Sequence, residues 1–134
     1  MFSIEKIIEG DWVTPVYDHV HHGRCFYLFE ESRVALLDHI GCPYDKLLAQ
    51  GQAIVIARVE ADYKREVKAG KVTVTCEEPA IEGRNLILKQ KILNERGKVA
   101  VEARIEMVFM DLQARRGMYP PEAFKEAFLA WSKC

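Results

Sequence analysis

The stretch from Tyr17 to Cys25 gathers the side chains of this sequence that are best suited to chemistry. It runs YDHVHHGRC and holds one aspartate, Asp18, together with histidines at positions 19, 21 and 22. A carboxylate beside imidazoles can supply a general base, a nucleophile or a group that polarises a carbonyl. A simple turn aspartate beside solvated histidines fits the pattern as well, so the residues alone leave both interpretations open.

The same histidines and Cys25 are also potential zinc ligands. However, they straddle a junction between a loop and a helix, and they match no standard ligand spacing. We therefore keep a metal site only as a rival hypothesis, and we expect neither a metal nor another cofactor.

A helix is predicted to follow this polar stretch, over about seventeen residues from Gly23. Its apolar side chains recur at near-helical spacing, and further leucines widen the stripe, so we expect the helix to be covered on most sides. The stripe consists of Phe26, Phe29, Val34, Leu37 and Ile40, widened by Leu28 and Leu36. Gly41 suits the position after the helix end, Pro43 acts as a stop, and residues 44–50 fit further helical turns.

The hydrophobic period then changes to two, which predicts strands. They cover residues 53–63, 71–77, 85–93 and 99–109, with a tight hairpin loop at 94–97. The first half of 53–63 is continuously apolar, so we expect it to be buried on both faces. Residues 12–17 read as an edge strand because of Pro15, residues 2–9 as either a helix or an edge strand, and a last helix begins near 120–122.

One strand, a long helix, four antiparallel strands in a meander and a terminal helix predict an α+β fold. The 134 residues form a single domain, residues 1–134. A formal charge of -1 argues against nucleic acid and anionic membranes as partners, and no apolar run approaches the length of a membrane span. The N-terminus does not resemble a signal peptide, and four scattered cysteines favour a cytoplasmic location.

The order of short motifs carries a family resemblance over roughly residues 11–130. His19-Val20 precedes Phe29-Glu30-Glu31-Ser32-Arg33, and Ala61-Asp62-Tyr63 precedes Gly70 and Val72-Thr73-Val74. In this respect the chain resembles the 4-hydroxybenzoyl-CoA thioesterase-like family of hot-dog acyl-CoA thioesterases. The resemblance implies a curled antiparallel five-stranded sheet around a long central helix. It also implies a homodimer or homotetramer with sites at the subunit interface.

The activity implied by the resemblance is hydrolysis of an acyl-CoA or acyl-carrier-protein thioester to a free acid and a thiol. Many members of the family place a catalytic aspartate where this sequence has Pro15, so Asp18 is the nearest carboxylate. Our hypothesis makes Asp18 the base or nucleophile, His22 the group that polarises the carbonyl, and His19 a second supporting candidate. A non-hydrolytic acyl-thioester binding protein and an acyl-thioester dehydratase are the alternatives on the same fold.

Substrate binding is assigned to residues on both sides of these groups. The N–H groups of His22, Gly23 and Arg24 at the helix start would stabilise an oxyanion, and the glycine would allow close approach of the carbonyl. Cations would meet the phosphates of CoA. The predicted binding residues are Tyr17, Gly23, Arg24, Lys64 and Arg65, with Lys68 or Arg115 and Arg116 as further cations.

Glu30 and Arg33 lie three residues apart on one helix face, so we expect a structural ion pair, either with each other or with a neighbouring subunit. Glu30 is also a fallback catalytic carboxylate, because some hot-dog thioesterases use an acidic residue on the central helix. The width of an acyl pocket would depend on which of several large side chains face it. These are Phe26, Tyr27, Leu28, Met107 and Phe109.

Overall fold

The computed structural model describes residues 1–16 and 18–133, so Tyr17 and Cys134 lie outside the described residues. The helices are α1 (Arg24–His39), α2 (Tyr44–Ala49) and α3 (Glu122–Ala130), with short 3₁₀ turns at Gly10–Trp12 and Trp131–Lys133. The strands are β1 (Phe2–Ile8), β2 (Val13–Thr14), β3 (His19–Val20), β4 (Gln52–Tyr63), β5 (Gly70–Glu82), β6 (Asn85–Leu93), β7 (Val99–Asp111) and β8 (Arg116–Met118).

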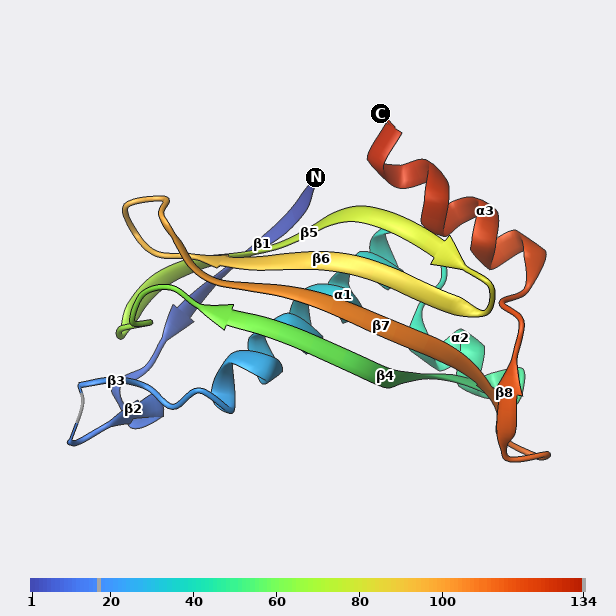
Figure 1. Cartoon of the computed structure of the whole chain (residues 1–134). Coiled ribbons are helices and arrows are strands. Elements are labelled where there is room, and N and C mark those ends of the chain that lie inside the picture. The colour runs from blue at the N-terminus through green and yellow to red at the C-terminus, as the bar shows by residue number, and fades with distance from the viewer. Residues whose placement is uncertain (17, 134) are drawn as a thin grey trace.

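The main sheet runs in the order β1-β5-β6-β7-β4, with the short β8 added to β7, and all of its pairs are antiparallel. The sheet curls along one side of α1, so the predicted α+β hot-dog arrangement is confirmed (Figure 1). The predicted meander holds only for β5, β6 and β7, because β4 pairs with β7 and not with β5. The loop from β4 to β5 therefore crosses the end of the sheet.

The first strand of this sheet is β1, which settles the open choice for residues 2–9 in favour of a strand. The prediction that residues 12–17 provide that strand was wrong. Among residues 12–16, which the structure describes, only Val13 and Thr14 form a strand, and they pair with His19 and Val20 in a separate hairpin. Pro15 lies in the turn of this hairpin, where its missing N–H costs no ladder hydrogen bond.

The apolar first half of β4 is not buried on both faces, contrary to the prediction. Val55 is 40% exposed and Ile56 is 47% exposed. Val55 pairs with Val108 on the outer face of the sheet, whereas Ile56 pairs with the buried Met107 on the inner face and lies on the last of the described strands in the sheet order. An edge strand with exposed apolar side chains is a surface on which another strand can pair.

Helix α1 is also less covered than its pattern predicts. Its buried face consists of Cys25, Leu28, Phe29, Ser32, Leu36 and Leu37. Phe26 and Val34 from the predicted stripe are instead 43% and 39% exposed. The helix end is as expected, because Gly41 has a φ of 80° and the Cys42 N–H bonds to the Leu37 carbonyl at 2.9 Å.

The core lies between α1 and the inner face of the sheet. Strand β7 alternates as predicted, with Val101, Ile105 and Phe109 buried on the inner side. Phe124 and Phe128 of α3 close the core near Phe109, whose ring centroid is 4.7 Å from that of Phe124. Each fully buried leucine or phenylalanine contributes roughly 1.5–3 kcal/mol, so this layer fixes α1 against the sheet. Among the described helices, none is long and apolar enough to cross a bilayer.

Candidate functional site: a groove beside the start of the central helix

The loop leading into α1 is fixed by the end of β4 and by the segment that follows it. The Val20 N–H donates to the Val67 carbonyl at 2.6 Å, and the Tyr63 hydroxyl donates to the His22 carbonyl at 3.0 Å. Burial raises the pKa of the Tyr63 phenol, and the nearby Cys25 thiol adds to this effect. The phenol therefore stays protonated at neutral pH and keeps its hydrogen to donate. These contacts hold the start of α1 in one place relative to the sheet.

A cleft of about 540 Å³ opens between this loop and the residues after β4. Several residues that the sequence predicts for the site line it, namely His19, His22, Lys64 and Arg65, together with His21 and Tyr63. Asp18 is not among the lining residues. It is exposed at the hairpin turn with a φ of 55°, and its N–H donates to the Thr14 carbonyl. Tyr17 lies outside the described residues.

The three histidines have different partners. His19 Nδ1 lies 3.7 Å from Glu66 Oε1. The rings of His21 and His22 stack with their centroids 4.2 Å apart. The Gly23 N–H donates to His21 Nδ1 at 3.0 Å, which requires that nitrogen to carry no proton. His21, for which the sequence suggested only the rival zinc role, thus contacts the backbone at the helix start.

Two of the three N–H groups proposed as oxyanion donors already have acceptors in the loop. The Gly23 N–H bonds to His21 as described, and the Arg24 N–H bonds to the His21 carbonyl at 2.9 Å. The His22 N–H has no acceptor among the described residues. The Arg24 guanidinium lies over the Trp12 ring, 4.9 Å from its centroid, which keeps this cation beside the hairpin.

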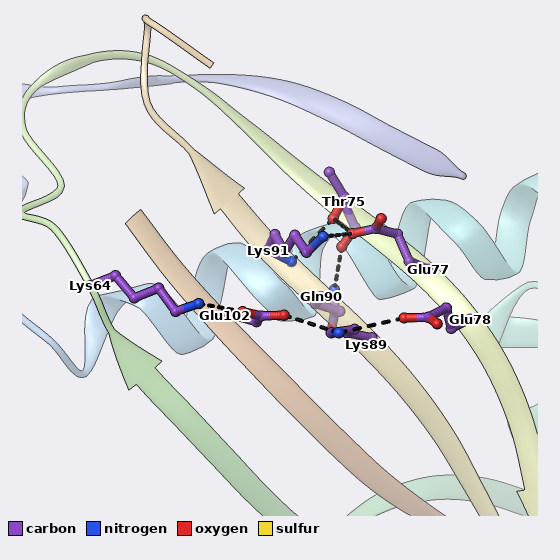
Figure 2. A network of polar contacts seen from close by, with 8 residues as sticks. All are labelled: Lys64, Thr75, Glu77, Glu78, Lys89, Gln90, Lys91 and Glu102. Atoms are coloured by element: carbon purple, nitrogen blue, oxygen red, sulfur yellow. Dashed lines mark hydrogen bonds and ion pairs between the residues drawn. The ribbon is translucent and has the colours of Figure 1, made fainter. Parts of the chain in front are cut away.

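The cations after β4 are partly engaged with the protein. Lys64 Nζ lies 2.8 Å from Glu102 Oε2, as Figure 2 shows, and Arg65 donates to the Val99 carbonyl at 2.6 Å. Lys68 lies 4.0 Å from Glu66. Arg115 and Arg116 lie at the turn between β7 and β8, at the other end of the sheet from the β2–β3 hairpin (Figure 1). Only Lys64 and Arg65 of these five therefore lie at the cleft.

The zinc hypothesis gains no support from the geometry. Among the described residues, no group of three or more histidine, cysteine or acidic side chains is arranged to hold a metal ion. Cys25 is 1% exposed, and burial raises the pKa of its thiol to about 11. A zinc ligand must be a thiolate, which this environment disfavours.

A second hollow, which we call the helix groove, runs along α1 beside the edge of the sheet. It has a volume of about 320 Å³ and is lined by residues of α1, β4 and β7. Gly23 lies at its start, Glu30 and Arg33 lie further along the helix, and the walls are apolar. Those walls are Phe26, Tyr27, Phe29, Ile56, Val59 and Ile105.

The helix groove continues toward α3 in an inner cavity of about 300 Å³, and the two share Glu30, Arg33 and Ile56. Of the side chains expected to shape an acyl pocket, Phe26 and Tyr27 line the groove and Met107 lines the inner cavity. Leu28 and Phe109 are fully buried in the core instead.

The expected ion pair between Glu30 and Arg33 is not formed, since among the described ion pairs none joins these two residues. Arg33 Nη1 instead donates to Gln90 Oε1 at 2.9 Å. Glu30 is exposed, although its charge still acts on the guanidinium. Gln90 was missed in the sequence, yet a glutamine at an inward position of an otherwise apolar strand face was a visible signal.

Comparisons with known proteins agree with this architecture. A family model described as the thioesterase-like superfamily matches residues 11–128. A comparison with curated proteins gave no match.

Solved structures of similar fold include a hypothetical protein from Staphylococcus aureus in complex with CoA. It has a TM-score of 0.89 and 17% identity, and the alignment covers 98% of this chain and 84% of that one. A 1,4-dihydroxy-2-naphthoyl-CoA thioesterase from Synechocystis has a TM-score of 0.86 and 14% identity, with 97% and 96% covered. A probable thioesterase from Escherichia coli has a TM-score of 0.79 and 24% identity, with 95% and 96% covered.

Identities this low establish a shared fold, whereas the family model rests on sequence and spans most of the chain. Both point to the same group of proteins: this chain is a hot-dog protein and belongs to the thioesterase-like superfamily.

Proposed function

We propose that the protein hydrolyses the thioester bond of an acyl-CoA, with the acyl group in the helix groove and the CoA portion at the histidine cleft. The observation that carries this proposal is a single groove lined both by Gly23, at the start of α1, and by the carboxylate-bearing residue Glu30. Such a groove supplies an apolar wall for the acyl group and a base for water. The CoA bound to a structural neighbour supports the choice of thiol.

In the proposed reaction, a water oxygen attacks the thioester carbonyl carbon while a carboxylate removes one of its protons. The oxyanion that forms is stabilised by N–H groups at the start of α1 and by the helix dipole. The His22 N–H has no acceptor among the residues that the structure describes, and the Gly23 N–H becomes available when it leaves His21. The carbon–sulfur bond then breaks, and the CoA thiolate leaves and takes up a proton.

Two carboxylates compete for the role of base. Glu30 lines the helix groove together with Gly23, so we favour it as the group that activates water. Asp18 lies at the exposed hairpin turn and lines neither the cleft nor the groove. It is the base if the substrate reaches it from the side of the hairpin. His22 and His19, which line the cleft, would orient the thioester or the water.

We further propose that two copies pair through their β4 edges. The exposed Ile56 of β4 lines the helix groove together with the exposed Phe26 and Tyr27 of α1. Pairing would cover this surface and satisfy the open backbone groups of the edge. It would also close the helix groove with residues of the second copy.

The described cysteines 25, 42 and 76 are free thiols, which agrees with the reducing cytoplasm that the proposal assumes. The direct test incubates the protein with a panel of acyl-CoAs and follows released CoA with a thiol reagent. We expect release above the spontaneous rate for at least one member. Tight binding of every ligand without release would instead identify a non-hydrolytic binding protein. Appearance or loss of a carbon–carbon double bond would identify a dehydratase.

A further inference from the structure

Gln90 is fully buried on β6 and contacts α1 directly. Its Nε2 donates to the Phe29 carbonyl at 3.0 Å and lies 3.4 Å from the Thr75 carbonyl. Because the amide nitrogen is committed to these carbonyls, Oε1 must face Arg33, whose Nη1 donates to it at 2.9 Å. The glutamine thus fixes the position of the guanidinium.

The Arg33 guanidinium carries five N–H donors, and the bond to Gln90 uses one of them. No other acceptor is found for it among the described side chains. Arg33 lines both the helix groove and the inner cavity, whose remaining walls are apolar except for Glu30 and the Tyr44 ring. The Tyr44 hydroxyl is itself bonded to the backbone of Ile54. The Arg33 guanidinium is therefore a fixed cation in an apolar channel, and it has N–H donors left to bind a ligand.

This placement is costly for the protein itself. Burial lowers the pKa of Arg33, and the charges of nearby groups, Glu30 among them, only partly oppose that effect. A plain alkyl chain in the groove would remove the remaining water from the N–H groups and offer no acceptor in return. Buried donors without acceptors are strongly unfavourable, whereas a bond from a charged donor to an oxygen is among the strongest hydrogen bonds.

We propose that Arg33 determines acyl specificity, by selecting acyl groups that carry an acceptor oxygen (hydroxyl, keto or carboxylate) part of the way along the chain. The inference rests on the proposed function and names its substrate class. Arg33 lies ten residues after Gly23, about 15 Å along the helix axis, and its side chain leans back toward the helix start. The oxygen must therefore lie well beyond the carbon next to the thioester.

The test compares acyl-CoAs of one chain length that are saturated or that carry a hydroxyl, a keto group or a terminal carboxylate. Binding is measured by calorimetry and hydrolysis by CoA release. We expect at least one oxygenated chain to be preferred over the saturated one by about tenfold or more. Comparison among the three oxygenated ligands shows which oxygen-bearing group, hydroxyl, keto or carboxylate, Arg33 selects. A wild-type preference for the saturated chain would overturn the inference, whatever the variants do.

The Arg33→Met variant keeps much of the side-chain volume and removes the donors. We expect it to lose the preference and to bind the saturated chain at least as well as the wild type does. Arg104→Met removes the same group from the outer face of the sheet and should leave the preference unchanged. If Arg33→Met retains the wild-type preference, Arg33 is not the selecting residue.

Calorimetry separates the two proposals, since a preference that depends on Arg33 without any CoA release would support the selection and refute hydrolysis. Sedimentation of Arg33→Met, measured alongside, detects the different case in which Arg33 only holds two copies together. In that case the dimer is weakened and the ligand preference is not, which contradicts the inference.

Discussion

The outer face of the sheet and the helix groove contain the same kinds of charged side chain, but the two regions differ in how far these side chains are paired. On the outer face, Glu102 lies 2.8 Å from Lys64 and 3.1 Å from Lys89, which also approaches Glu78, as Figure 2 shows. Hydrogen bonds from the two lysines lower the pKa of Glu102 to about 2. These charged side chains form ion pairs with one another within the chain.

In the helix groove the charged side chains lack such ion-pair partners among the described residues. Among the described residues, Glu30 and Arg33 do not pair, and the guanidinium, with five donors, makes one hydrogen bond. Consecutive residues of β6 supply both environments, because Lys89 and Lys91 point outward and Gln90 points toward α1. Successive side chains of a strand point to opposite faces of the sheet. Neighbouring residues of β6 therefore belong to a paired ion network on one face and to an incompletely paired polar cluster on the other. Polar groups that lack partners beside an apolar groove are available to bind a ligand.

The largest expected effect comes from the carboxylates. Glu30→Gln should lower the rate of thioester hydrolysis by about a hundredfold to ten-thousandfold, because the amide cannot accept the proton of water. The matched change on the outer face, Glu102→Gln, should leave the rate within about twofold. Steady-state kinetics on the best acyl-CoA checks both, with thermal melting as a control for folding. A large loss in Asp18→Asn with little change in Glu30→Gln would place the base on the hairpin instead.

A second effect concerns the free edges of the sheet. Ile56→Lys puts a charge on the inward side of β4, and we expect it to weaken the proposed dimer by about a hundredfold, since a lysine there opposes strand pairing. Ile7→Lys makes the same change on β1, where Ile7 is 60% exposed, and should leave the dimer intact. Analytical ultracentrifugation over a range of concentrations measures both. Equal effects of the two variants would show that β4 is not the pairing edge.

A third comparison tests the alternation on β6 itself. Gln90→Leu should lower the free energy of unfolding by about 1–3 kcal/mol, because the partly buried Arg33 loses its acceptor. Lys89→Leu, one residue away on the exposed outer face, should change it much less. Urea unfolding of both variants gives the difference directly. Similar losses in the two variants would mean that the hydrogen bonds of Gln90 contribute no more to stability than the surface contacts of Lys89.

The smallest effect is expected from acid. The folded pKa of Glu102 lies below its usual 4.5, so its contribution to stability is present above about pH 4.5 and is lost as the pH falls toward 2. We expect this contribution to stay below about 1 kcal/mol, because solvent and salt screen pairs near the surface. Melting temperatures of the wild type and Glu102→Gln should therefore converge as the pH falls from 6 to 2. A gap that persists at pH 2 would assign the effect to packing.

The sequence predicted the long helix, its end at Gly41, the hairpin loop ending at Gly97 and the strand β7. Each depends on local rules of period and turn chemistry. It failed where exposure depends on topology. A continuous apolar run such as residues 53–57 looks the same in a central strand and in an edge strand, so the exposure of Val55 and Ile56 could not be predicted from it.

The candidate site was predicted in part for similar reasons. The sequence assigned His19 and His22 to catalysis and Lys64 to CoA binding, and all three line one cleft in the structure. Spacing along the helix suggested a bond between Glu30 and Arg33, but a buried acceptor from β6 competes for the guanidinium. That contact joins residues 57 positions apart, which no local pattern contains. The roles proposed for Asp18 and the histidines stay predictions.

The two free edges of the sheet also decide which assemblies can close. Pairing of β4 with β4 is self-complementary and ends with two chains, whereas pairing of β4 with β1 would leave an edge open at each end and continue as a fibre. Strand β1 carries Glu5 and Lys6, which form ion pairs with Lys71 and Glu31 of the same chain. If the proposed β4 dimer forms, removing these charges is expected to let it polymerise.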